Sequence, residues 1–249
     1  MSDLLLIHGT CHGAWCFEAL IPALANLGIC ARAIDLPGRD GSLTTLDAYA
    51  QAILDVAMPD TILVGHSAGG YAITAAAEAD PTRFAGLVYL CAYLPASGQS
   101  LSDMRRAGPS QPLLPAIRMA GDRQSFTIDP ALACDAFYQD CAREVAANAI
   151  ARLCPQPVLP QQTPLWPKAG LQLPRHYIIC DHDQTIPPGY QRQMAGTRPG
   201  SYVHSLGSGH SPFLSMPAAL AATLAEIRSR MANGRQPWAK GSANQTYLE

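Results

Sequence analysis

Short apolar segments rich in β-forming residues alternate with helical segments along most of this chain. The candidate strands read as continuously apolar, which is typical of strands buried on both faces of a sheet. They span residues 4–8, 30–34, 61–64, 87–91, 176–180 and 202–206. Strands separated by helices form parallel sheets. The sequence therefore predicts an α/β fold with a mainly parallel, six-stranded sheet and helices on both faces.

The spacing of apolar residues also predicts the helices between these strands. We expect them at 17–27, 46–56, 68–79 and 217–231, with Ser215 placed to cap the first turn of the last one. A chain of 249 residues is long enough for one sizeable core with an insertion, and too short for two ordinary α/β domains.

The alternation stops between residues 95 and 168, where many prolines surround one helical block at 130–153. Structureless segments of this length are uncommon in compact domains unless they cover or bind something. We therefore predict an α/β core formed by 1–94 and 169–233, with 95–168 inserted as a helical lid. Residues 234–249 lack periodicity and are expected to be a loose tail.

The charge and hydropathy of the chain indicate which kinds of binding partner it favours. Charged residues make up only 14% of the chain, the net charge is −2, and the only basic cluster is Arg105-Arg106. This pattern favours neither nucleic acid nor an anionic membrane as a partner. No apolar run approaches the roughly 18 residues of a membrane span, and the run after Asp3 is too short for a signal-peptide core. We expect a cytoplasmic protein, and the composition is compatible with a homodimer.

The cysteines give no metal or disulfide pattern. All 8 are scattered without Cys-x-x-Cys spacing, so neither a zinc site nor a disulfide framework is predicted. Most of them are interpreted as small apolar core residues.

The clearest functional motif is Gly65-His66-Ser67-Ala68-Gly69. It follows a predicted strand and opens a predicted helix, which is the context that a G-x-S-x-G nucleophile turn needs. Glycines on either side of the serine remove side chains that would collide with neighbouring backbone. Ser67 is therefore the predicted nucleophile, exposed at the carboxyl edge of the sheet.

A serine hydroxyl needs a base to take its proton, and seven histidines compete for that role. His210 lies in the loop after the last strand and so reaches the same edge as Ser67. His176 and His204 fall inside strands, and His66 should point away from the serine. His8 and His12 flank the first loop, where we expect structural hydrogen bonds.

The base needs a carboxylate to hold its tautomer, and that acid should lie between the serine and the histidine in chain order. No acid follows the strand ending at Cys91, whereas Asp181 and Asp183 both follow the strand ending at Cys180.

The oxyanion of an acyl-transfer intermediate needs preorganised backbone N–H groups. Thr10, in a glycine-flanked loop, and Ala68, directly after the serine, are the predicted donors.

The substrate pocket is predicted from the proposed lid and the loops around the serine. Apolar side chains of the lid could wall a cavity over Ser67, as binding pockets commonly are walled. The candidates are Gly9, Met119, Phe126, Phe137, Tyr138, Trp166 and Ser211.

Three blocks resemble the α/β-hydrolase superfamily, and more narrowly its branch of plant hydroxynitrile lyases and methylesterases with related bacterial esterases. These blocks are residues 7–15, residues 64–70, and residues 180–187 together with Gly209-His210. The resemblance extends to about residue 230, although the lid is similar only in length and character. By the family pattern the acid precedes the Ile186-Pro187 pair by three residues, which selects Asp183.

Two departures from the lyases bear on the chemistry. The lyases carry a hydroxyl residue directly after the first-loop histidine and a lysine directly after the catalytic histidine, where this chain has Gly9 and Ser211. Cyanide release calls for a nearby cation, and a cyanohydrin calls for a hydroxyl partner. The departures favour hydrolysis.

The sequence therefore predicts a serine esterase that cleaves small, apolar carboxylic esters through an acyl-enzyme, with catalytic residues Ser67, His210 and Asp183. No organic cofactor and no metal is implied, and a small-molecule ester is the expected partner. One alternative is hydroxynitrile lyase-type carbon–carbon cleavage. The other is a non-catalytic small-molecule receptor on the same fold, because fold alone does not fix function.

Overall fold

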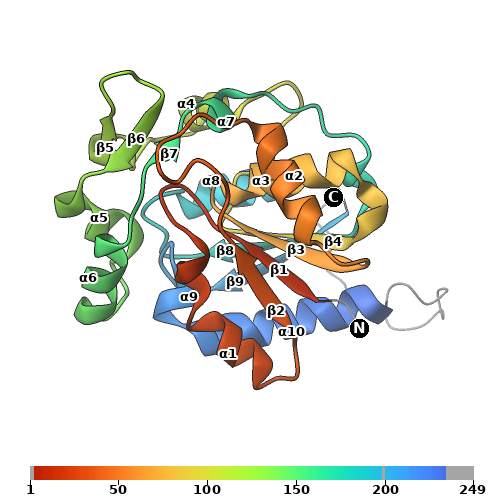
Figure 1. Ribbon diagram of the computed structural model, residues 1–249. Coiled ribbons are helices and arrows are strands. Elements are labelled where there is room, and N and C mark those ends of the chain that lie inside the picture. The colour runs from red at the N-terminus through yellow and green to blue at the C-terminus, as the bar shows by residue number, and fades with distance from the viewer. Residues whose placement is uncertain (1–2, 198–199, 234–249) are drawn as a thin grey trace.

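The computed structural model describes residues 3–197 and 200–233, and its centre is a parallel sheet (Figure 1). The sheet has 6 strands in the order β2-β1-β3-β4-β8-β9. Their bounds are β1 Leu4–Ile7, β2 Ala31–Ile34, β3 Thr61–His66, β4 Phe84–Leu90, β8 Arg175–Cys180 and β9 Ser201–Leu206. The predicted α/β fold class is confirmed, and all six strands lie close to their predicted positions.

Helices cover both faces of this sheet (Figure 1). On one face lie α2 (Leu46–Val56), α3 (Gly69–Ala79) and α8 (Pro188–Gly196), and on the other lie α1 (Leu20–Ala25) and α10 (Pro217–Asn233). Alternate residues of β1 belong to the two cores, with Leu5 in one and Leu6 in the other. Burial on both faces explains why the central strands read as unbroken apolar runs.

The prediction of full burial is wrong for the two edge strands. In β2 all four residues are partly or fully exposed, and in β9 both Tyr202 and Val203 are 40% exposed. An edge strand has a sheet neighbour on one side only and is covered less completely by helices.

The first and last helices differ in detail from the predictions. The predicted helix 17–27 is a short 3-10 turn, η1 (Ala14–Phe17), followed by the shorter helix α1. The predicted helix 217–231 is present as α10. However, Ser215 belongs to the preceding short helix α9 (Pro212–Ser215), and its buried hydroxyl has no hydrogen-bond partner among the described residues, so its predicted capping role is wrong.

The segment 95–168, called the insertion below, contains more structure than the sequence suggested. It has an antiparallel sheet of 3 short strands, β5 (Ile117–Met119), β6 (Ser125–Ile128) and β7 (Gln156–Pro157). The predicted helical block 130–153 is two helices rather than one. The helices of the insertion are α4 Leu101–Ala107, α5 Pro130–Phe137, α6 Arg143–Ala151 and α7 Leu159–Gln162.

Three further 3-10 turns complete the described elements, η2 (Pro81–Arg83), η3 (Leu114–Ala116) and η4 (Gly170–Gln172). Across residues 3–197 and 200–233, no helix combines the length and apolarity that crossing a bilayer requires. The predicted loose tail 234–249 lies outside the described residues.

All eight cysteines carry free thiols. Cys11, Cys16, Cys91 and Cys180 are buried, whereas Cys30 is exposed and the other three are half-buried. The interpretation as core residues therefore holds for half of the set.

Candidate active site

The predicted nucleophile lies in a sharp turn between β3 and α3. Ser67 has a φ of 52°, in the left-handed region that non-glycine residues rarely adopt, and its side chain is only slightly accessible. A Cβ added to Gly65 would lie 2.7 Å from the carbonyl oxygen of Gly69, and one added to Gly69 would lie 2.7 Å from that of Ile7. The two glycines are therefore required by close backbone approach, as the motif predicts.

Asp183 and His210 form a buried pair at the same edge of the sheet. Asp183 follows β8 and His210 follows β9, and Nδ1 of the imidazole donates to Oδ2 of the carboxylate at 2.7 Å. The carboxylate also accepts hydrogen bonds from the backbone N–H groups of Thr185 and Ile186 and from Nε2 of Gln191. These donors fix the carboxylate, which in turn holds the imidazole in the tautomer with its proton on Nδ1.

The alternative acid, Asp181, is not part of this arrangement. Its carboxylate is partly exposed and forms an ion pair with Arg192. The structure therefore brings Asp183 to His210, in agreement with the family pattern, and leaves Asp181 at the surface.

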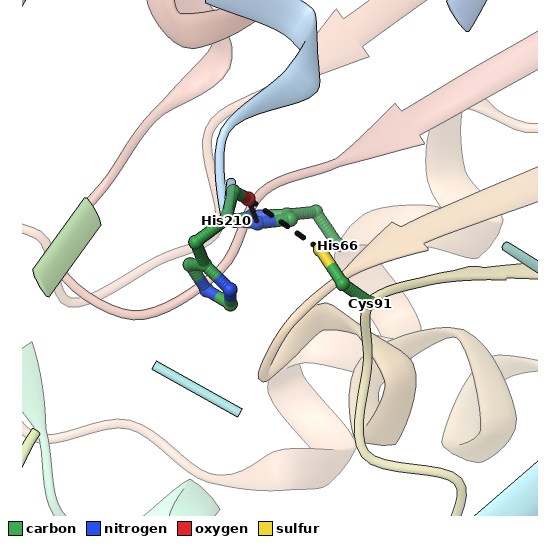
Figure 2. A group of neighbouring side chains, drawn as sticks. All are labelled: His66, Cys91 and His210. Carbon is green, nitrogen blue, oxygen red and sulfur yellow. Dashed lines mark hydrogen bonds between the residues drawn. The ribbon is translucent and has the colours of Figure 1, made fainter. Parts of the chain in front are cut away.

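The backbone of His210 is held by the ends of two central strands (Figure 2). Nε2 of His66 donates to the carbonyl oxygen of His210 at 2.9 Å, and Sγ of Cys91 donates to the same oxygen at 3.4 Å. Ligand atoms of these three residues lie within 4.8 Å of one another, a spacing that could suit a metal. Because the His66 and Cys91 atoms already donate to one carbonyl, the arrangement fits a structural anchor better than a set of metal ligands.

The remaining nitrogen of the base is available for chemistry. Nε2 of His210 is buried and makes no hydrogen bond to any residue in the described part of the chain, Ser67 included. Catalytic hydrogen bonds in unliganded sites are commonly long and tighten when substrate binds. With Nδ1 committed to Asp183, Nε2 is the atom that can accept the serine proton.

The histidines of the first loop have structural partners, as predicted. Nε2 of His8 accepts the backbone N–H of Leu36 at 3.0 Å, and Nε2 of His12 accepts the hydroxyl of Tyr138 at 2.7 Å. Burial lowers the pKa of His8 to about 4 and that of His12 to about 3. Both imidazoles are therefore neutral at physiological pH.

The two strand histidines contact each other far from the serine turn. Nδ1 of His176 and Nε2 of His204 are 2.9 Å apart, and burial lowers the pKa of both rings. The prediction that they are packing or surface residues agrees with these positions.

The predicted oxyanion donors are free of internal partners. Neither the backbone N–H of Thr10 nor that of Ala68 donates a hydrogen bond to a described residue. Gly9 lets the first loop approach the serine turn, because a Cβ there would lie 2.8 Å from Cβ of Ser67. Sequence reasoning missed Gln161 in α7, whose Nε2 donates to Oγ1 of Thr10 at 2.8 Å. No local signal in the sequence distinguishes this glutamine from its neighbours.

A narrow cavity that opens to solvent adjoins Ser67. Its lining combines the serine turn and first loop with residues of the insertion and of the loops after β4 and β8. The lining residues include Thr10, Ser67, Tyr93, Leu101, Arg105, Ser110, Gln111, Pro112, Leu113, Gln161, Thr185, Pro187 and Tyr190.

A second narrow cavity lies beside the first. It shares Leu101 and Gln161 with the first cavity and is lined also by Gly9 and Ala68. The two proposed oxyanion donors, Thr10 and Ala68, thus line adjoining cavities.

None of the predicted pocket residues is among the described residues that line the cavity at Ser67, and that part of the prediction is wrong. Met119 is 46% exposed and Trp166 is 59% exposed. Phe126, Phe137 and Tyr138 are buried in a hydrophobic cluster that joins the insertion to the first loop. Phe137 also stacks on the imidazole of His210, with ring centroids 5.7 Å apart, so it packs against the base rather than lining the cavity.

The two remaining pocket candidates have different outcomes. Ser211 is fully buried, and its hydroxyl has no hydrogen-bond partner among the described residues. Gly9 lines only the second cavity. Six of the residues that line the first cavity come from helix α4 and the loop after it, and none of these six is aromatic.

Comparison with known proteins gives relatives along nearly the whole chain. The model of the alpha/beta hydrolase family matches residues 4–223. A pyrethroid hydrolase of Sphingobium wenxiniae is 33% identical, covering 95% of this chain and 91% of its own. Methyl jasmonate esterase 1 of Vitis vinifera is 29% identical, covering 90% of this chain and 95% of its own.

Solved structures agree with these sequence relatives. The crystal structure of a pyrethroid hydrolase from Sphingobium faniae superposes with a TM-score of 0.84 at 29% identity, covering 93% of this chain and 99% of that one. The resemblance to the branch of methylesterases and bacterial esterases is thereby confirmed, and the chain belongs to the alpha/beta hydrolase family.

Proposed function

We propose that this protein hydrolyses small carboxylic esters through an acyl-enzyme formed on Ser67. The observation that carries the proposal is the serine held at a φ of 52° on the same sheet edge as the buried Asp183–His210 pair. The names of the relatives, which include a pyrethroid hydrolase and a methyl jasmonate esterase, support ester hydrolysis as the reaction.

Each group has a distinct role in this mechanism. Nε2 of His210 takes the proton of Ser67 as its Oγ attacks the ester carbonyl, and then gives that proton to the leaving alcohol. Asp183 orients the imidazole and stabilises its cationic form. The N–H groups of Thr10 and Ala68 stabilise the negative oxygen of the tetrahedral intermediate. Water, activated by His210, then hydrolyses the acyl-serine and releases the acid.

Two observations weigh against lyase chemistry. A residue with a hydroxyl side chain could not replace Gly9 without moving Ser67, because the space for its Cβ is already filled. The position after His210 holds the buried, uncharged Ser211, which supplies no cation for a leaving cyanide. A direct cyanide-release assay with a cyanohydrin tests this alternative.

Replacement of the nucleophile is the main test. Ser67→Ala should lower the turnover of an activated aryl ester by about three orders of magnitude. A fluorophosphonate probe should label the wild type and not this variant. Binding of an apolar ligand without labelling or turnover would favour the receptor alternative instead.

We further propose that the enzyme acts in the cytoplasm on a soluble ester, and that it needs neither nucleic acid nor a membrane. A homodimer is part of this proposal, and sedimentation at micromolar concentration tests it.

A further inference from the structure

A cationic side chain lines the cavity that contains Ser67. Arg105 lies in the last turn of α4, is half-buried, and shares this cavity with Ser67 and Thr10. Burial lowers the pKa of its guanidinium, which still keeps its charge at any physiological pH.

No carboxylate pairs with this charge within the described residues, and the side chain that interacts with it electrostatically is the neutral Tyr93. Arg105 forms neither an ion pair nor a hydrogen bond there, and its Nε is buried. The acid nearest in sequence, Asp103, is already engaged by Ser100 and Arg106. Removing a guanidinium from water without a partner costs free energy, so a partner supplied by a ligand would recover it.

Other arginines of this chain show the usual arrangement. Arg39 pairs with Asp35, and Arg152 pairs with Glu18 through both of its terminal nitrogens. Arg105 is half-buried as these arginines are, and it differs from them in its lack of a carboxylate partner.

Helix α4 holds Arg105 in place. A reciprocal capping box joins Ser100 and Asp103 at the start of the helix. Near its end, the hydroxyl of Tyr190 donates to the carbonyl oxygen of Met104 at 2.8 Å, and the hydroxyl of Tyr71 contacts Sδ of Met104 at 3.0 Å. The arginine backbone is fixed before any ligand arrives, which reduces the entropic cost of binding.

The two cavities differ in the chemistry of the residues that line them. The cavity at Ser67 contains the cation, whereas the adjoining cavity is lined by apolar groups that include Leu36, Leu46 and Tyr49. Ala68, a proposed oxyanion donor, lines the apolar cavity. An ester carbonyl held at Ser67 and Ala68 would place one arm of the substrate in each cavity.

We propose that the natural substrate is an ester with one apolar arm and one arm that ends in a carboxylate, which Arg105 binds. This inference rests on the proposed function. A guanidinium presents paired N–H donors in a plane that matches the two oxygens of a carboxylate. Arg105 thus determines substrate specificity. The proposed substrate carries a charge, whereas the sequence predicts an apolar ester.

Two matched substrate pairs test this proposal and locate the carboxylate. The acyl-side pair is phenyl hydrogen glutarate and its terminal amide, and the alcohol-side pair is 4-acetoxybenzoate and 4-acetoxybenzamide. The wild type should prefer the acid over the amide in at least one pair by roughly tenfold to a hundredfold in kcat/KM. The pair that shows the preference identifies the arm.

Variants separate the role of Arg105 from a general charge effect. Arg105→Gln should reduce the acid-to-amide ratio of kcat/KM to about one, mainly by raising KM for the acid. Arg106→Gln is the matched control on the same helix, and it should leave the ratio unchanged. A thermal unfolding midpoint equal to that of the wild type shows that the Arg105 variant is folded.

Three results would overturn the inference while leaving the esterase proposal intact. They are Ser67-dependent hydrolysis with no preference for either acid, equal losses for acid and amide in Arg105→Gln, and the same loss of preference in Arg106→Gln. Retained activity in Ser67→Ala would instead overturn the proposed function itself.

Discussion

Asp183→Asn should inactivate the enzyme through the tautomer of His210. In the native site both oxygens of Asp183 accept hydrogen bonds only. One oxygen accepts from the backbone N–H groups of Thr185 and Ile186, which cannot reverse their role. The amide oxygen of the variant must therefore face those two groups, and its NH₂ must face His210 and Gln191.

The hydrogen bonds of Gln191 prevent it from relieving this mismatch of donors. Gln191 cannot reverse its own amide, because its Oε1 accepts the N–H of Cys180 at 3.1 Å and its Nε2 donates to the carbonyl of Ile186 at 2.7 Å. His210 would thus turn its Nδ1 into an acceptor and carry its proton on Nε2. That nitrogen could no longer take a proton from Ser67.

The expected loss is about 10⁴-fold in kcat, which corresponds to about 5 kcal/mol of transition-state stabilisation. Steady-state hydrolysis of 4-nitrophenyl acetate measures it, with thermal unfolding as the check that the variant is folded. Asp181→Asn is the matched control, since it removes only a surface ion pair, and its rate should stay within about twofold of wild type. A folded Asp183→Asn enzyme within tenfold of the wild-type rate would refute the tautomer argument.

Three further predictions concern the surroundings of this network. Gly9→Ala should lower kcat at least tenfold and destabilise the fold by about 1–3 kcal/mol, because its Cβ would lie 2.8 Å from that of Ser67; equal melting temperatures and rates would contradict this. Gln161→Leu should reduce kcat about threefold to tenfold by freeing the first loop, whereas the exposed neighbour Gln162→Leu should have no effect in the same assay. The pKa of His12 is about 3 when folded and near 6.5 when unfolded, so its contribution to stability is complete above pH 6.5. This contribution is lost as the pH falls from 6.5 toward 3, by up to about 1.4 kcal/mol per pH unit. Urea titrations at pH 7, 6 and 5 measure the free energy of unfolding, and His12→Gln should reduce its dependence on pH.

The fold and the catalytic edge could be predicted because both depend on local patterns. Continuous apolar runs at 61–64 and 87–91 mark strands covered on both faces, whatever the rest of the chain does. The turn at 65–69 has a backbone path that only small neighbours permit. Asp183 and His210 follow from the rule that the carboxyl ends of parallel strands meet at one edge.

The pocket and the insertion could not be predicted in this way, because their structure depends on contacts between distant segments. Phe137 and Tyr138 could equally have been pocket residues, and only the packing of the insertion against the core shows that they are buried contacts of His210 and His12. Arg105 looked like half of an exposed basic pair. Its position in the cavity depends on how α4 is held against Tyr71 and Tyr190. The short strands β5 and β7 carry too few residues for a recognisable period.

The hydrogen bond from His66 to the carbonyl oxygen of His210 has a mechanical consequence. His66 directly precedes Ser67 in the chain, so the peptide that carries the nucleophile also tethers the base. A small displacement of β3 moves both groups together and changes their separation little. Lengthening the side chain at 66, or removing its donor, would allow the two reacting groups to drift independently, and the enzyme would lose proton transfer before it lost its fold.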